Sequence, residues 1–195
     1  MSVGNDVIDL NWNPKHGEAY FRKLRSWAFA LSEQKLVADY PTKVGSMILW
    51  SIKEAAYKSS IKCGNRGRFV PEEFHIELVA RKKHLVQTTV TFSGEKFKSE
   101  TVISGEVIHS VTILAEDNFE SFTYNSEKIS SDNYLEQSEK VRNSLAKQLN
   151  HKYKGSITFS KDNSGIPNVL ENGNSLKKDI SFSHHGHVVA YAMDL

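Results

Sequence analysis

A glutamate and a lysine stand one helical turn apart in the stretch Trp50 to Lys58, where together they could bind a metal ion or a phosphate. The composition of this stretch favours a helix, and neither glycine nor proline occurs between Ser46 and Cys63. Trp50, Glu54 and Lys58 follow the spacing i, i+4, i+8, so they share one face of that helix. The alternative interpretation is a solvated surface pair, which contributes only about 0.3–0.5 kcal/mol.

Two further stretches carry residue types that suit similar chemistry. The stretch Gly4 to Leu10 places Asp6 and Asp9 beside a short apolar run, which predicts a strand with acids near its end. The stretch Ile180 to His187 combines serines with three histidines shortly before another apolar run. Asp6 could act as a turn former or a cap, and on its own neither stretch identifies a function.

Taken together, the three stretches resemble the signatures of the 4′-phosphopantetheinyl transferase superfamily. These are a G-x-D at the start of a strand, a W-x-x-K-E-A-x-x-K helix and an S-x-S-H before a final strand, found here at Gly4–Asp6, Trp50–Lys58 and Ser181–His184. The resemblance spans almost all of the 195 residues. It implies the transfer of phosphopantetheine from coenzyme A to a serine of an acyl or peptidyl carrier protein, with release of adenosine 3′,5′-bisphosphate.

The resemblance also implies roles for individual residues. Asp6 and Glu54 match the carboxylates that bind Mg²⁺, and Glu54 could also accept the serine proton, directly or through a metal-bound water. Lys58 matches the lysine that contacts the pyrophosphate, and Lys53 is expected to add positive potential nearby. Ile8 stands where larger members often have another acid, so we expect water in place of a third carboxylate ligand.

On the coenzyme side, Ser183 and His184 match the segment that meets the phosphates of coenzyme A from the opposite lobe. His184 is expected to donate a hydrogen bond near the 3′-phosphate. Gly165 and Pro167 match a G-x-P element of the same lobe, although Ile166 stands where the larger members tend to have a lysine. We therefore expect contacts on the adenine side to be weaker or to come from the backbone.

Three other interpretations remain open. A non-catalytic module that binds coenzyme A or a carrier protein would keep the fold without the chemistry, although Asp6, Glu54 and Lys58 are all present. A metal-dependent phosphohydrolase would use the acids but leaves the S-x-S-H stretch unexplained. The histidines at 184, 185 and 187 could bind zinc, but no spaced fourth ligand accompanies them, and structural zinc sites usually have four ligands.

Composition argues against several other classes of protein. The 25 Lys and Arg residues and 23 Asp and Glu residues give a net charge of +2, without the concentrated basic face that nucleic-acid binding needs. No stretch approaches the roughly 18 apolar residues of a membrane span, and the N-terminus lacks a signal-peptide pattern. The single cysteine, Cys63, cannot form an internal disulfide, so we expect a cytoplasmic protein.

The periodicity of the sequence predicts the elements that would position these residues. Helices are predicted where apolar residues recur at helical spacing: 17–30, 42–64 and 131–151. Strands are predicted where β-branched and apolar residues gather: 3–10, 74–79, 86–92, 107–115, 156–159, 180–183 and 188–193. The expected fold class is α+β with antiparallel strands.

The order of the signatures predicts the domain organisation. In the surfactin-synthetase-activating type of the superfamily, two similar lobes face each other across the coenzyme A site, each with an antiparallel sheet and a packed helix. Here 1–117 resembles the second lobe, 131–195 resembles the first, and 118–130 is predicted to link them. This order predicts a circularly permuted pseudo-dimer that works as a monomer. The alternative is one lobe of the holo-acyl-carrier-protein synthase type, enlarged by a sheet insertion, which works as a trimer.

Overall fold

The computed structural model describes residues 1–12 and 16–195, and its elements fall into two halves along the chain. The first half comprises β1 (Val3–Asp9), α1 (Glu18–Ala28), α2 (Leu31–Leu36), α3 (Thr42–Lys62), the 3-10 helix η1 (Pro71–Glu73), β2 (His75–Lys82), β3 (Leu85–Phe92), β4 (Glu95–Ser104) and β5 (Val107–Leu114). The second half comprises the 3-10 helix η2 (Phe119–Ser121), β6 (Phe122–Lys128), α4 (Tyr134–Leu149), β7 (Ile157–Lys161), β8 (Pro167–Glu171), β9 (Asn174–Ser175), β10 (Ile180–His185) and β11 (Val188–Asp194).

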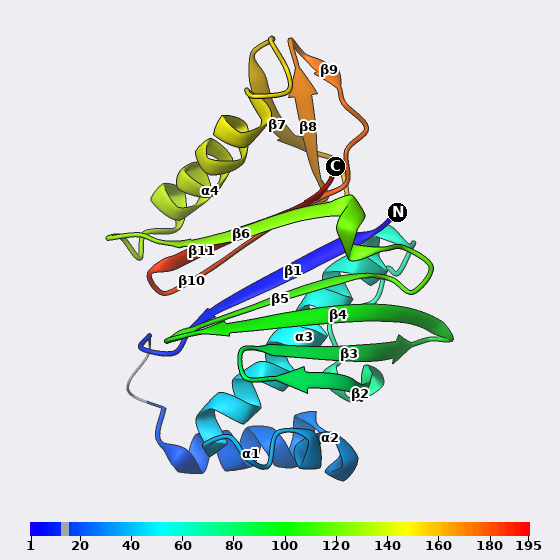
Figure 1. Ribbon diagram of the computed structural model, residues 1–195, viewed down its shortest axis with the longest axis vertical. Helices are drawn as coiled ribbons and strands as arrows, with labels where there is room; N and C mark the ends of the chain where they lie inside the picture. Colours follow the sequence, from blue (N-terminus) through cyan, green and yellow to red (C-terminus); the bar gives the residue numbers. More distant parts are fainter. Residues whose placement is uncertain (13–15) are drawn as a thin grey trace.

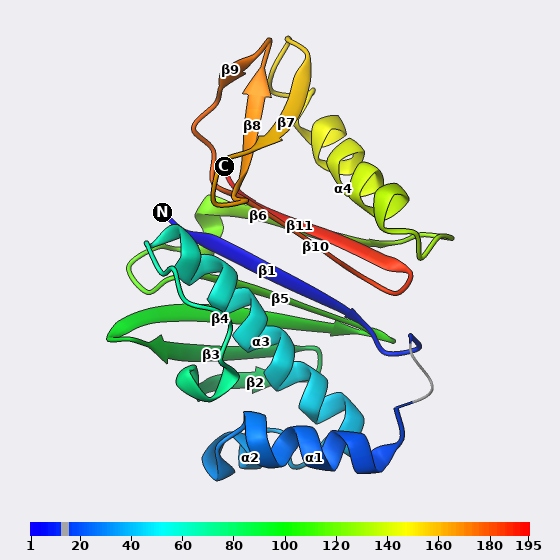
Figure 2. The same cartoon turned by 180° about the vertical axis from the view of Figure 1, so that it is seen from behind.

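The fold belongs to the α+β class, as predicted, because antiparallel sheets are combined with four α-helices in the described residues. The strands of the first half form one sheet in the order β1-β5-β4-β3-β2. Helix α3 crosses one face of this sheet, and α1 and α2 lie near the N-terminal half of α3 (Figure 2). None of the helices in the described part of the chain is long and apolar enough to cross a membrane.

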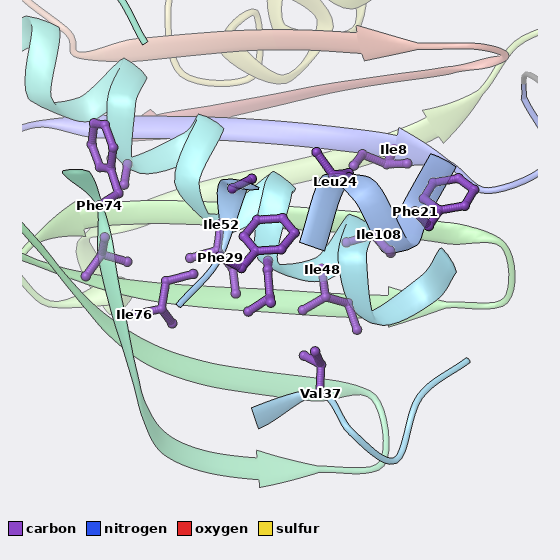
Figure 3. Packing of buried hydrophobic residues seen from close by; sticks show 14 of the residues in the cluster. Ile8, Phe21, Leu24, Phe29, Val37, Ile48, Ile52, Phe74, Ile76 and Ile108 are labelled. Carbon is purple, nitrogen blue, oxygen red and sulfur yellow. The ribbon is translucent and has the colours of Figure 1, made fainter. Parts of the chain in front are cut away.

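An apolar core joins α3 to the five-stranded sheet. Ile48 and Ile52 come from α3, Ile108 comes from β5, and Phe74 precedes β2 (Figure 3). Each of these side chains is at most 1 % exposed. Burial of apolar surface is the main favourable contribution to packing, so the apolar face of α3 packs against the sheet. The side chains on the other faces of α3 therefore point away from the sheet.

The strands of the second half form two three-stranded antiparallel sheets, in the orders β10-β11-β6 and β7-β8-β9. Helix α4 packs on them through Val141, Leu145 and Leu149, which are buried in one cluster with Ile180 and Val189. Figure 1 shows α4 and the β7-β8-β9 sheet on the side of β6, β10 and β11 that faces away from the first half.

The two halves share one connectivity. In the first half the opening strand β1 pairs with the last strand β5, which pairs with β4; in the second half β6 pairs with β11, which pairs with β10. A helix that packs on the sheet follows the opening strand in each half. The segment 118–130, which the sequence predicts as a linker, contains the opening strand β6. Its polar sequence suits an edge strand, which has few buried positions.

Strand β1 also joins the first half to the second, and Figure 1 shows it beside β10 and β11. Backbone N–H groups at alternate positions of β1 donate to side chains of β10 and the residue before it; the pairs are Val3–Asp179, Asn5–Ser181 and Asp9–His185. At this edge of the five-stranded sheet, these side chains accept the hydrogen bonds that a neighbouring strand would otherwise accept. Lys62, at the end of α3, adds an ion pair with Asp179.

Gly4 lies where β1 passes closest to α3. A Cβ atom at this position would lie 2.0 Å from the carbonyl oxygen of Ala55 and 2.7 Å from the backbone nitrogen of Ser59. Both contacts are with backbone atoms, so no side chain could turn aside to make room. The first residue of the G-x-D sequence is therefore a glycine because only a hydrogen atom fits between strand and helix.

We expect Gly4→Ala to lower the free energy of unfolding by at least about 3 kcal/mol, because β1 and α3 must move apart. Urea denaturation followed by circular dichroism measures the loss. Gly17→Ala is the matched control, because a Cβ atom there meets nothing within 4 Å. The control should change stability by no more than about 1 kcal/mol. Equal stability of the two variants would contradict the close packing at Gly4.

Candidate active site

Asp6 and Glu54, which are far apart in the sequence, line the same cavity of about 310 Å³. Elements β1, α1, α3 and β10 bound this first cavity, which also includes His184 and His185. Burial of the Glu54 carboxyl, together with the negative charge of Asp6, raises the pKa of Glu54 to about 7. Two carboxylates arranged in this way could hold a hard divalent cation, since Mg²⁺ typically takes one or two protein carboxylates.

Lys58 lies one helical turn beyond Glu54 and contacts Asp6. Its Nζ donates to Oδ1 of Asp6 at 3.3 Å and to the carbonyl oxygen of Asn5 at 2.9 Å. The Lys58 side chain also lines a second cavity of about 230 Å³. Because Asp6 lines the first cavity and Lys58 the second, their ion pair marks the boundary between the two.

The second cavity lies between α3 and the second half of the chain, and its lining is basic. Lys58 and Lys62 come from α3, Arg142 from α4 and Lys161 from β7. No aspartate or glutamate is found among the described residues that line it. The segment 165–167 forms part of the wall, so Gly165 and Pro167, which were predicted to contact a coenzyme, both line this cavity. A cavity of this charge suits a phosphorylated ligand.

His184 lines both cavities, whereas Ser183 lines neither. The Ser183 hydroxyl is buried and accepts a hydrogen bond from Nδ2 of Asn5 at 2.9 Å, so it holds β10 against β1. This differs from the prediction that Ser183 contacts coenzyme A, and the reason is that neighbouring side chains of a strand point to opposite sides. The His184 ring packs edge-on against Tyr134, and burial together with the charge of Lys58 lowers its pKa.

Lys53 also departs from its predicted place, because it points into the core of the first half. Its Nζ donates to Oε2 of Glu33 at 2.8 Å and to the carbonyl oxygens of Ala28 and Pro71. Both charged side chains are at most 2 % exposed, so Lys53 adds no positive potential to either cavity. Consecutive residues of a helix point about 100° apart, which directs Glu54 to the cavity and Lys53 to the core.

Asp9 positions the turn that carries the histidines. Its Oδ1 accepts the backbone N–H of Asn11, and its Oδ2 accepts that of His187. Its own N–H donates to Nδ1 of His185. Both carboxylate oxygens are therefore engaged within the protein. The three histidines do not gather around one point either, since the described residues contain no group of three or more His, Cys, Asp or Glu side chains that could hold a metal ion.

The arrangement as a whole has two acids on one side of the Asp6–Lys58 ion pair and a basic cavity on the other. It suits a ligand whose anionic phosphates lie on the basic side and whose reacting phosphorus lies near the acids. No protein-family model matches the chain, and a search of curated proteins finds no significant match. Its function is therefore inferred from the site.

We expect Lys53→Met to lower the free energy of unfolding by about 3–5 kcal/mol, because the Glu33 carboxylate would stay buried without its partner. The double variant Lys53→Met with Glu33→Leu should recover part of this loss, since it removes both charges. Recovery should be incomplete, because Glu33 also accepts the backbone N–H groups of Ala30 and Ile76. Thermal unfolding measures the stability of the Lys53→Met variant and of the double variant. A Lys53→Met variant as stable as the wild type would exclude the buried ion pair.

The raised pKa of Glu54 should make stability depend on pH. Between pH 4.5 and about 7 the folded protein keeps a proton that the unfolded chain has lost, so folding becomes less favourable as the pH rises. Without divalent cations, we expect the wild type to lose about 2–3 kcal/mol relative to Glu54→Gln across this range. Denaturant unfolding at a series of pH values measures the difference, and a constant difference would show that Glu54 titrates normally.

Proposed function

We propose that this protein is a 4′-phosphopantetheinyl transferase, which uses coenzyme A and Mg²⁺ to modify a serine of an acyl or peptidyl carrier protein. The observation that carries the proposal is the Asp6–Lys58 ion pair at the boundary between an acid-bearing cavity and a basic one. The shared connectivity of the halves supports the two-lobed form of that fold. Because one chain supplies both cavities, we propose a monomer, and its single cysteine favours the cytoplasm.

The basic cavity suits the phosphorylated nucleotide of coenzyme A. Arg142 and Lys161 provide donors for the 3′-phosphate, and Lys58 stands where it can contact the pyrophosphate. The backbone at 165–167 provides a wall for the adenosine. His184 is neutral near pH 7, because burial lowers its pKa, and a ring N–H can still donate a hydrogen bond to a phosphate oxygen.

The two acids of the first cavity fit a bound Mg²⁺. Their oxygen ligands are of the hard type that this ion prefers. Burial and then the negative charge of Asp6 raise the pKa of Glu54, and a divalent cation would offset both effects. When bound, the ion would neutralise negative charge on the pyrophosphate. Asp6 is further held by Lys58, whose ion pair orients its carboxylate.

In the proposed reaction, the serine hydroxyl of the carrier attacks the β-phosphorus of coenzyme A. The bond between the serine oxygen and phosphorus forms as the bond between that phosphorus and the bridging oxygen breaks, and adenosine 3′,5′-bisphosphate leaves. Lys58 stabilises the negative charge on the phosphate oxygens. Glu54 accepts the serine proton, directly or through a water.

The test is to incubate the protein with an apo carrier protein, coenzyme A and Mg²⁺, and to follow the carrier by intact-mass spectrometry. We expect the mass gain of one phosphopantetheine group. Asp6→Ala and Glu54→Ala should slow the transfer by at least about 100-fold, because each removes a charge that acts at the reacting phosphorus. Asp39→Ala is the control and should transfer at the wild-type rate, since Asp39 is exposed and lies outside both cavities.

The alternative outcomes identify other functions. Tight binding of coenzyme A without any mass gain in several apo carriers would indicate a non-catalytic binding module. Release of adenosine 3′,5′-bisphosphate without modification of the carrier would indicate a phosphohydrolase. Transfer that survives in both the Asp6 and the Glu54 variants would contradict the site assigned here.

A further inference from the structure

A buried polar cluster lies directly behind the candidate site, between the two halves of the chain. It consists of Asn5 from β1, His109 from β5 and Ser183 from β10, which are 0 %, 4 % and 5 % exposed. Nδ2 of Asn5 lies 2.9 Å from Oγ of Ser183 and 3.2 Å from Nε2 of His109. None of these three side chains takes part in the reaction proposed above.

The His109 ring accepts a hydrogen bond within this cluster. The amide nitrogen of Asn5 can only donate, so Nε2 of His109 accepts, and a neutral imidazole has one nitrogen free for this purpose. Burial, and then the positive charge of Lys58, lowers the pKa of His109 to about 3. The ring therefore stays neutral at physiological pH and keeps its acceptor.

Packing alone does not require polar side chains at these positions. The flanking positions on the same face of β1 and β5 are valines that belong to apolar clusters: Val3, Val7, Val107 and Val111. Oδ1 of Asn5 has no hydrogen-bond partner among the residues that the structure describes. A buried amide with an unpartnered oxygen is less favourable than an apolar side chain of the same size. The polarity of the cluster therefore needs an explanation other than stability.

Two members of the cluster are the chain neighbours of site residues. Asn5 precedes Asp6 in β1, and Ser183 precedes His184 in β10; neighbouring side chains of a strand point to opposite sides. The carbonyl oxygen of Asn5 also accepts a hydrogen bond from Nζ of Lys58 at 2.9 Å. Any displacement of Asn5 would therefore move both Asp6 and the acceptor that holds Lys58.

We propose that Asn5 and His109 are positioning residues, which hold the centre of β1 against β10 and thereby set the separation between Lys58 and His184. The hydrogen bonds at Val3 and Asp9 hold only the two ends of β1. Apolar contacts are not directional, whereas a hydrogen bond has a preferred distance and angle. The inference rests on the function proposed above, because a donor that spans both cavities needs their walls at a fixed separation.

The test compares two substitutions of His109, with transfer to an apo carrier protein followed by intact-mass spectrometry at saturating coenzyme A. His109→Leu removes the acceptor and should slow the transfer by at least about tenfold, because small displacements of reacting groups are costly. His109→Gln keeps an oxygen that can accept from Asn5, so its rate should be within about threefold of the wild type. Thr88→Val is the control and should transfer at the wild-type rate, since it removes a buried hydroxyl of β3 that lines neither cavity.

A triple variant separates positioning from folding. Asn5→Leu, His109→Leu and Ser183→Ala together make the cluster apolar, so its midpoint of urea denaturation should equal or exceed that of the wild type. Its transfer should still be as slow as that of His109→Leu. A lower midpoint would show that the cluster serves stability, and that result would overturn the inference.

The rates distinguish failure of the inference from failure of the proposed function. Equal rates for His109→Leu and His109→Gln, or wild-type transfer by the triple variant, would overturn the inference and leave the proposed function standing. A wild-type protein that transfers nothing would overturn the proposed function, and the inference with it.

Discussion

The candidate site depends on how closely strand β1 passes helix α3. Only a hydrogen atom fits between the strand at Gly4 and the backbone of the helix at Ala55. This contact fixes Asp6, two residues further, beside Lys58. Asn5 and Asp9 of the same strand donate hydrogen bonds to side chains of β10, the strand to which His184 belongs. A single seven-residue strand therefore sets the relative positions of the acids, the lysine and the histidine.

One buried and one partly buried ion pair hold α3 in its orientation. Lys53 with Glu33 joins the helix to the elements of the first half, and Lys62 with Asp179 joins its C-terminal end to the segment that leads into β10. Removal of one partner of a buried pair is strongly destabilising, because the other charge stays buried without compensation. Between these ion pairs, the side chains of Glu54 and Lys58 line the two cavities.

The sequence was sufficient to predict the α+β class, the long helix and most strands, because periodicity and breaker residues act locally. It also placed Asp6, Glu54 and Lys58 on elements that could meet. It could not separate Lys53 from Glu54, since both are charged and only the tertiary packing decides which faces the core. The edge strand β6 was hidden by its polar sequence. Arg142 reaches the basic cavity from a helix whose sequence carries no local sign of it.

The position of the metal ion in a complex tests this account most directly. Crystals grown with coenzyme A and with Mn²⁺ in place of Mg²⁺ would locate the ion by anomalous scattering. The account predicts one strong peak within coordination distance of carboxylate oxygens of both Asp6 and Glu54 and of the pyrophosphate, with Lys58 on the adjacent phosphate. A peak that touches neither acid, or a pyrophosphate bound away from Lys58, would contradict it.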